Sequence, residues 1–237
     1  MTQESSLLSN DEFVERLRLE GAARYHDRHP FHHRMHAGQL NKAQLQGWVL
    51  NRYYYQTRIP IKDAILISKS EDPAFRRSWI RRIHEHDGMQ EGEGGLAQWQ
   101  RLGAGVGLTR AELVGLERVL PAVRFACDAY VEFVRARPLV EAVASSLTEF
   151  FSPEIMANRL KAWELHYPWV DSAMLEYFRG RISRAKIDSQ EAITFVLANA
   201  TTRQVQERCV NALITKCQIL WALLDAVSMA YEDSPAQ

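Results

Sequence analysis

The stretch RCVNALITKCQILWALLDAVSMAY at residues 208–231 decides the fold class. Its apolar residues recur at steps of three and four, which is the spacing of one helix face, with Lys216 in the middle. The stripe consists of Leu213, Leu220, Leu224 and Val227. The same spacing runs through nearly the whole chain, and no segment sustains the alternation of a half-buried strand. The sequence therefore predicts an all-α protein.

Capping signals and prolines divide the chain into helices. Capping boxes start at Ser9 and Thr109, and a looser version starts at Asp188. The predicted helices span 10–28, 42–68 with a break at Pro60, 73–87, 91–102, 110–136 with a break at Pro121, 138–150, 153–166, 171–185, 189–199 and 202–231, with a short turn at 30–37. No linker, charge run or repeat marks a boundary, so we expect one domain over 1–237.

Composition narrows the possible partners and the location. The 29 basic and 29 acidic side chains cancel, which disfavours nucleic acid or an anionic membrane as a partner. Three widely spaced cysteines fit reduced thiols rather than disulfides or a zinc site. The stretch at 1–10 lacks the character of a leader, and no segment approaches the ~20 apolar residues of a membrane span. We expect a cytoplasmic protein.

Cations and phenols on apolar stripes are the most informative residues, because burying an unpaired charge costs considerable free energy. Lys216 lies mid-helix with leucines on both sides, which favours a function over a side chain that reaches toward the helix end. Arg52 and Gln56 continue an apolar stripe and face one side, with Tyr55 nearby. Further candidates are Arg159, Tyr177 with Arg181, and Arg82 with His86, and Glu149 is the one acid expected near them.

Several inward cations in a chain of zero net charge, with few matching acids on the same faces, indicate an anionic ligand. Carboxylates suit the fork of a guanidinium group, so the expected ligand carries several of them. For any single arginine, the alternative is a place on the solvated flank of a stripe.

The arrangement of the histidines does not fit a metal site. None of the eight histidines follows a glutamate by three residues, so the Glu-x-x-His pairs of di-iron bundles are absent. Pro30 interrupts the helix that would align the histidines between His26 and His36, and we expect no metal site.

Seven of the 12 glycines fall between Gly88 and Gly107, with no preceding strand, which indicates a flexible lid rather than a phosphate loop.

With these residues in view, the chain resembles the pyrroloquinoline-quinone synthase family over nearly its full length. The matching stretches are RYHDRHPFHHRMHAG at 24–38, NRYYYQTRIPIKDA at 51–64, RRIHEHDGMQEGEGG at 81–95, SSLTEFFSP at 145–153 and the helix around Lys216. The resemblance implies a compact bundle of about seven helices, similar to haem oxygenase and thiaminase II. It further implies a homodimer that uses neither a metal nor an organic cofactor.

The resemblance also implies a reaction and a set of site residues. The reaction is the last step of the quinone's biosynthesis, in which a bicyclic precursor with several carboxylates is ring-closed and oxidised by O2, releasing H2O2. The implied catalytic residues are His86, Tyr177, Arg181 and His26. The implied substrate-binding residues are Tyr25, Arg52, Gln56, Lys62, Arg82, Tyr130, Glu149, Arg159 and Lys216; of both sets, Tyr25, His26, Lys62 and Tyr130 rest on the resemblance alone. Met156 departs from the family pattern, since many relatives have a histidine at this position. A thioether cannot shuttle a proton, so that contact of the family site is lost or moved in this chain.

A mechanism follows from these assignments. The cations hold the carboxylates and make ring closure a positioned unimolecular step. His86, whose pKa a cationic pocket should lower from ~6.5, is the expected base. The deprotonated ring then reduces dioxygen, and Arg181 with His86 stabilises the superoxide.

Three other functions compete with this hypothesis. A hydrolase similar to thiaminase II needs an activated cysteine, for which Cys127 is the candidate because it lies one helical turn before Tyr130. A non-catalytic carrier of the quinone would keep the cations but need no base. A haem-binding protein is disfavoured, because its axial histidine would face cations instead of an apolar slot.

Overall fold

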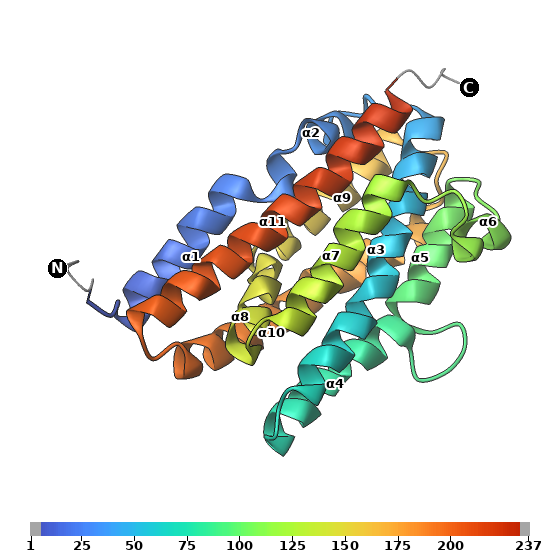
Figure 1. Ribbon diagram of the computed structural model, residues 1–237. Coiled ribbons are helices and arrows are strands. Elements are labelled where there is room, and N and C mark those ends of the chain that lie inside the picture. The colour runs from blue at the N-terminus through green and yellow to red at the C-terminus, as the bar shows by residue number, and fades with distance from the viewer. Residues whose placement is uncertain (1–5, 233–237) are drawn as a thin grey trace.

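The computed structural model describes residues 6–232, and this part of the chain forms helices and no strands (Figure 1). The α-helices are α1 (Asn10–Arg24), α2 (Pro30–His36), α3 (Lys42–Ser68), α4 (Pro73–Asp87), α5 (Gly94–Gly105), α6 (Arg110–Gly115), α7 (Pro121–Ala136), α8 (Leu139–Ala144), α9 (Ser152–His166), α10 (Glu176–Asn199) and α11 (Arg203–Tyr231). Short 3-10 helices are η1 (His26–Arg28), η2 (Ser145–Phe150) and η3 (Ser172–Leu175). The all-α prediction is confirmed, with more helices over these residues than the expected seven or so. Residues 1–5, part of the stretch judged not to be a leader, lie outside the described residues.

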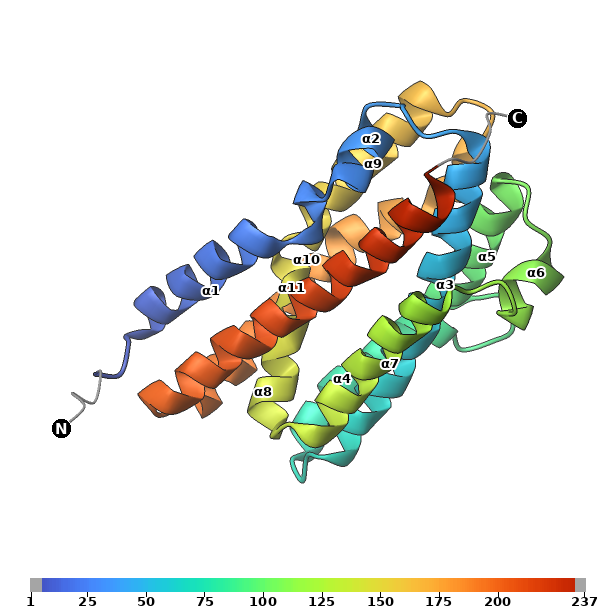
Figure 2. The same ribbon diagram turned by 45° about the horizontal axis from the view of Figure 1, so that its top comes forward.

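The long helices lie roughly side by side around a shared core. Helix α11 packs between α1 and α7, and α7 packs on α3 (Figures 1 and 2). Helix α10 packs against α9, α8 and η2, and α4 and α5 pack on α3. Lys216 therefore lies on a helix that has neighbours along both sides, where its stripe is buried, as the sequence indicated.

Helix α3 continues through Pro60, where the sequence analysis placed a break. Proline removes one backbone hydrogen bond from a helix interior. Pro60 is itself buried, and α3 packs against α4, α5 and α7, so tertiary packing maintains the helix across it. This continuity keeps Arg52, Gln56 and Lys62 on one rigid element.

Helix α10 is a single helix, and the predicted division at Asp188 is wrong. The pattern Asp188-x-x-Glu191 suggested a helix start. Instead, the Asp188 side chain is buried among arginines and caps no helix. The break predicted at Pro121 is confirmed, since 110–136 forms α6 and α7, separated by residues 116–120. The helix predicted at 10–28 ends at Arg24, where an extended Tyr25 precedes η1, and the helix predicted at 138–150 is α8 followed directly by η2.

Two further expectations need correction. Residues 30–36, expected to form a turn, form α2, which starts at Pro30 with the His29 side chain accepting a bond from the Phe31 amide. Helix α11 is long and apolar enough to cross a membrane by length and composition, although no such segment was expected. Its apolar window is 44% buried inside the bundle, and the core helix of a soluble protein meets the same criterion.

Candidate functional site

A small cavity of about 40 Å³ within the bundle brings most of the predicted site residues together. Helices α3, α4 and α10 contribute to its wall, together with η1 and η2. The predicted residues that line it are Tyr25, His26, Arg52, Gln56, His86, Glu149, Tyr177 and Arg181. They come from segments far apart in the sequence, so the bundle assembles the cavity.

The other five predicted residues are buried just behind this lining. Lys216 Nζ lies 4.3 Å from the ring centre of Tyr55, which lines the cavity, and 3.1 Å from that of Tyr130. Arg159 Nη1 lies 3.6 Å from the sulfur of Met156, another lining residue. All five are at most 4% exposed. They are Lys62, Arg82, Tyr130, Arg159 and Lys216.

Three of the buried cations have no carboxylate within 4 Å among the described residues. They are Arg52, Arg159 and Lys216. Lys216 Nζ has no hydrogen-bond partner there, and aromatic rings are its neighbours. Arg52 stacks on the Tyr55 ring at 4.0 Å, and Arg159 lies 5.0 Å from the Trp48 ring centre. Burial, followed by the Arg52 charge, lowers the pKa of Lys216 well below its ordinary value and that of Arg159 to about 9. The site is thus short of negative charge.

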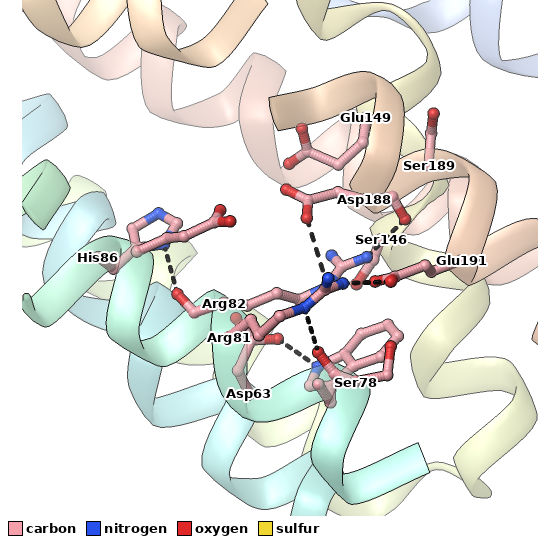
Figure 3. Close-up of polar contacts among 12 residues, drawn as sticks. Asp63, Ser78, Arg81, Arg82, His86, Ser146, Glu149, Asp188, Ser189 and Glu191 are labelled. Atoms are coloured by element: carbon pink, nitrogen blue, oxygen red, sulfur yellow. Dashed lines mark hydrogen bonds and ion pairs between the residues drawn. The ribbon is translucent and has the colours of Figure 1, made fainter. Parts of the chain in front are cut away.

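Arg82 and Arg181, in contrast, do have acidic partners, which corrects the expectation of few matching acids. Figure 3 shows Arg82 beside Asp188. Arg181 contacts Glu149 at 2.7 Å and Asp188 at 3.1 Å. Arg82 Nε lies 3.8 Å from the other oxygen of Asp188. Although burial raises the pKa of Asp188, Arg82 and Arg181 outweigh burial and lower it. One buried carboxylate therefore aligns both arginines.

Lys62 is paired as well. Its Nζ lies 2.5 Å from Asp63 and 3.2 Å from the Ser146 hydroxyl. The Trp79 indole N–H donates to the same Asp63 carboxylate at 2.7 Å. Lys62 is therefore held in a buried polar cluster beside the cavity.

His86 is the best-placed base in the cavity wall. Its Nδ1 lies 3.0 Å from the Arg82 carbonyl oxygen, which can only accept, so Nδ1 carries the proton and Nε2 is the basic atom (Figure 3). Burial, then the Arg181 charge, lowers its pKa to about 4. The predicted direction is confirmed, but desolvation contributes more than the cations do.

The tyrosines in the cavity wall are neutral hydrogen-bonding groups. Tyr177 donates its hydroxyl hydrogen to Gln56 Oε1 at 2.9 Å, and burial raises its pKa. Burial likewise raises the pKa of Tyr25, whose ring stacks on His26 at 4.3 Å. Both residues can donate to, or accept from, a bound ligand.

Cys127 lacks the features of a catalytic thiol. It is fully buried, and burial raises its pKa to about 12, so it is a poor nucleophile at neutral pH. This disfavours the hydrolase alternative. Over residues 6–232, no three histidine, cysteine or acidic side chains are grouped so as to hold a metal ion.

The glycine-rich segment is more ordered than a lid over 88–107 would be. Residues 94–105 form α5, whose Trp99 is 1% exposed, with an irregular connection at 88–93 before it and a turn at 106–107 after it. Gly94 has a φ of +78°, and a Cβ there would lie 2.4 Å from the Gly88 nitrogen. The glycines thus close a tight loop next to His86.

Sequence reasoning missed several residues of the site. Asp63 and Asp188 supply the paired negative charge, and His32 accepts a contact from Arg159 at 3.2 Å. His32 lies within the stretch at 24–38 that resembles the family, but its spacing from the other histidines gave no signal for a contact with Arg159. Asp63 adjoins Lys62 in the sequence, which was a usable signal.

Comparison with known proteins agrees with this architecture. The model of the TENA/THI-4/PQQC family matches residues 14–226. The chain is 49% identical to a pyrroloquinoline-quinone synthase of Ectopseudomonas mendocina, with 93% of this chain and 88% of that protein covered. It is 47% identical to one of Gluconobacter oxydans, with 95% of each chain covered.

Solved structures share the fold at low sequence identity. A protein of unknown function with a haem-oxygenase-like fold from Shewanella denitrificans superposes with a TM-score of 0.75 at 14% identity, covering 96% of this chain and 95% of that one. A TenA homologue from Pseudomonas syringae gives 0.73 at 13% identity, covering 96% and 98%. The family match and the relatives confirm the resemblance read from the sequence, and the chain belongs to the TENA/THI-4/PQQC family.

Proposed function

We propose that this protein is a pyrroloquinoline-quinone synthase. It takes a bicyclic quinone precursor bearing several carboxylates, closes its ring and oxidises it with dioxygen, releasing hydrogen peroxide. The observation that carries the proposal is the trio of buried cations without carboxylate partners, Arg52, Arg159 and Lys216, beside the cavity. The extensive identity to relatives of that name supports it further.

The cations bind and orient the substrate. A polycarboxylate supplies the negative charge that Arg52, Arg159 and Lys216 lack inside the protein, and it recovers part of the desolvation cost that these groups incur. Fixing the carboxylates holds the amine and the ring carbon of the precursor close together. Ring closure then proceeds as a positioned intramolecular step.

The proton and electron chemistry is assigned to His86, Tyr177 and Arg181, which line the cavity. His86 Nε2 accepts a carbon-bound proton, and Tyr177 exchanges hydrogen bonds with the substrate oxygens. The deprotonated ring itself supplies electrons to dioxygen, so we assign no step to a metal or an organic cofactor. Arg181 lies beside His86 and stabilises the anionic oxygen species that form.

The decisive experiment mixes the purified protein with the bicyclic precursor, first without and then with oxygen. We expect the precursor spectrum to shift on anaerobic binding, and oxygen to be consumed with release of hydrogen peroxide and the tricyclic quinone once air is admitted. A carrier would return the precursor unchanged without consuming oxygen. That result would refute the proposal.

The oligomeric state and the cellular location are also part of the proposal. We propose that the enzyme acts as a homodimer in the cytoplasm, as the resemblance implies. Light scattering during gel filtration tests the assembly, and fractionation of the producing cells tests the location.

A further inference from the structure

His32 of α2 connects Arg159 to His26. Arg159 Nη2 lies 3.2 Å from His32 Nε2, and His32 is 1% exposed. A guanidinium group has only N–H donors, so His32 Nε2 must accept this hydrogen bond. The single proton of a neutral His32 ring therefore lies on Nδ1.

The other ring nitrogen of His32 faces His26. His32 Nδ1 lies 2.9 Å from the His26 carbonyl oxygen and 3.3 Å from His26 Nδ1. The carbonyl oxygen can only accept, which agrees with a proton on His32 Nδ1. The same N–H faces His26 Nδ1, so that atom must be an unprotonated acceptor.

These contacts leave the proton of His26 on Nε2. Within the described residues, His26 Nε2 is buried and has no hydrogen-bond partner. The ring lines the cavity and is held flat against Tyr25. Burial, followed by the charges of Arg52 and Arg159, lowers the pKa of His26, and the ring is neutral at physiological pH. A buried N–H without an acceptor is costly until a ligand supplies one.

We propose that His32 is a positioning residue that fixes His26 as a neutral Nε2–H donor toward an acceptor oxygen of the bound ligand. Arg159 sets the tautomer of His32, and His32 sets that of His26. His26 thus acts as a hydrogen-bond donor, whereas His86 acts as the base. The identity of the ligand rests on the proposed function, whereas the tautomers do not.

The first test is nitrogen NMR of the ligand-free, full-length protein labelled in its histidines. We expect His26 to be protonated at Nε2 and His32 at Nδ1, with signals assigned by their loss in His26→Gln and His32→Phe. Protonation of His26 at Nδ1, or of His32 at Nε2, overturns the proposal. This measurement needs no reaction, so it succeeds or fails independently of the proposed function.

The second test compares His32→Phe with His33→Phe, which changes the exposed neighbouring histidine. We expect His32→Phe to let the His26 tautomers mix and to weaken binding of pyrroloquinoline quinone about tenfold, the effect of one hydrogen bond. His33→Phe leaves the His26 tautomer and the binding of pyrroloquinoline quinone unchanged. His26→Gln, which retains an N–H near the Nε2 position, binds within about threefold of the wild type. An unchanged His26 spectrum in folded His32→Phe overturns the proposal, and if that variant does not fold, the wild-type spectra decide.

Discussion

Lys216 shows how one residue can oppose folding and favour binding. Its ammonium group lies between the rings of Tyr55 and Tyr130, with no hydrogen-bond partner among the described residues. Aromatic faces attract a cation, but they replace only part of the hydration that it loses. The residue therefore makes the ligand-free protein less stable than a hydrocarbon side chain would.

Replacing Lys216 by leucine tests this account. We expect the free energy of unfolding, measured with urea, to rise by about 1–3 kcal/mol, because a buried charge gives way to an apolar group of similar size. Binding of pyrroloquinoline quinone should weaken at least tenfold in a spectroscopic titration. A less stable variant that binds as well as the wild type would make Lys216 a structural residue.

Replacing His86 by asparagine separates binding from oxidation. Asparagine retains an N–H near the position of Nδ1 for the Arg82 carbonyl but has no basic nitrogen at the position of Nε2. We expect the precursor to bind within a few fold of the wild type, while oxidation slows about a hundredfold or more. Stopped-flow absorbance with and without oxygen measures both. Normal turnover would remove His86 from the mechanism.

Among the ion pairs between α4 and α10, two differ in their exposure to solvent (Figure 3). Asp188 of α10 pairs with Arg82 of α4 in a buried setting, where the side chains are 8% and 5% exposed. Glu191 of α10 pairs with Arg81 of α4 at a more exposed position, where Arg81 is 51% exposed. The buried pair also holds Arg181, so it links the packing of two helices to the geometry of the site.

This contrast predicts unequal effects of matched substitutions. Asp188→Asn should lower the free energy of unfolding by about 3 kcal/mol or more, because it leaves Arg82 buried without a carboxylate partner. It should also raise the KM for the precursor. Glu191→Gln should cost less than about 1 kcal/mol and leave KM unchanged, since exposed pairs contribute little. Equal losses in urea unfolding would contradict the account.

For the whole molecule, buried neutral histidines make stability depend on pH. His86 takes up a proton below about 4 in the folded protein, but below its ordinary value of 6.5 when unfolded. Between these values the unfolded chain binds more protons, so the free energy of unfolding falls as the pH is lowered. His26, His32 and His36 have lowered pKa values for the same first cause, burial, and add to the effect.

We therefore expect the protein to lose stability between pH 6.5 and 4. His86 alone should account for about 3 kcal/mol, given about 1.4 kcal/mol for each unit of pKa difference. Urea unfolding at half-unit pH steps measures the slope, and His86→Asn should make it shallower. A flat profile across this window would show that these histidines take up protons over the same pH range in the folded and unfolded states, and would contradict their lowered pKa values.

The helical class, most helix positions and the inward orientation of Lys216, Arg52 and Arg159 could be predicted from the amino-acid sequence. Helical periodicity is local, since a residue's face follows from neighbours three and four positions away. Which cations are paired with carboxylates could not be predicted, because it depends on contacts between distant helices. The pairing of Arg82 with Asp188, 106 positions later, depends on where the fold places α4 relative to α10, and the contact of Arg159 with His32 depends on how α9 packs against α2. The same packing made α10 continuous at Asp188, because a buried ion pair there replaced the cap that the local pattern suggested.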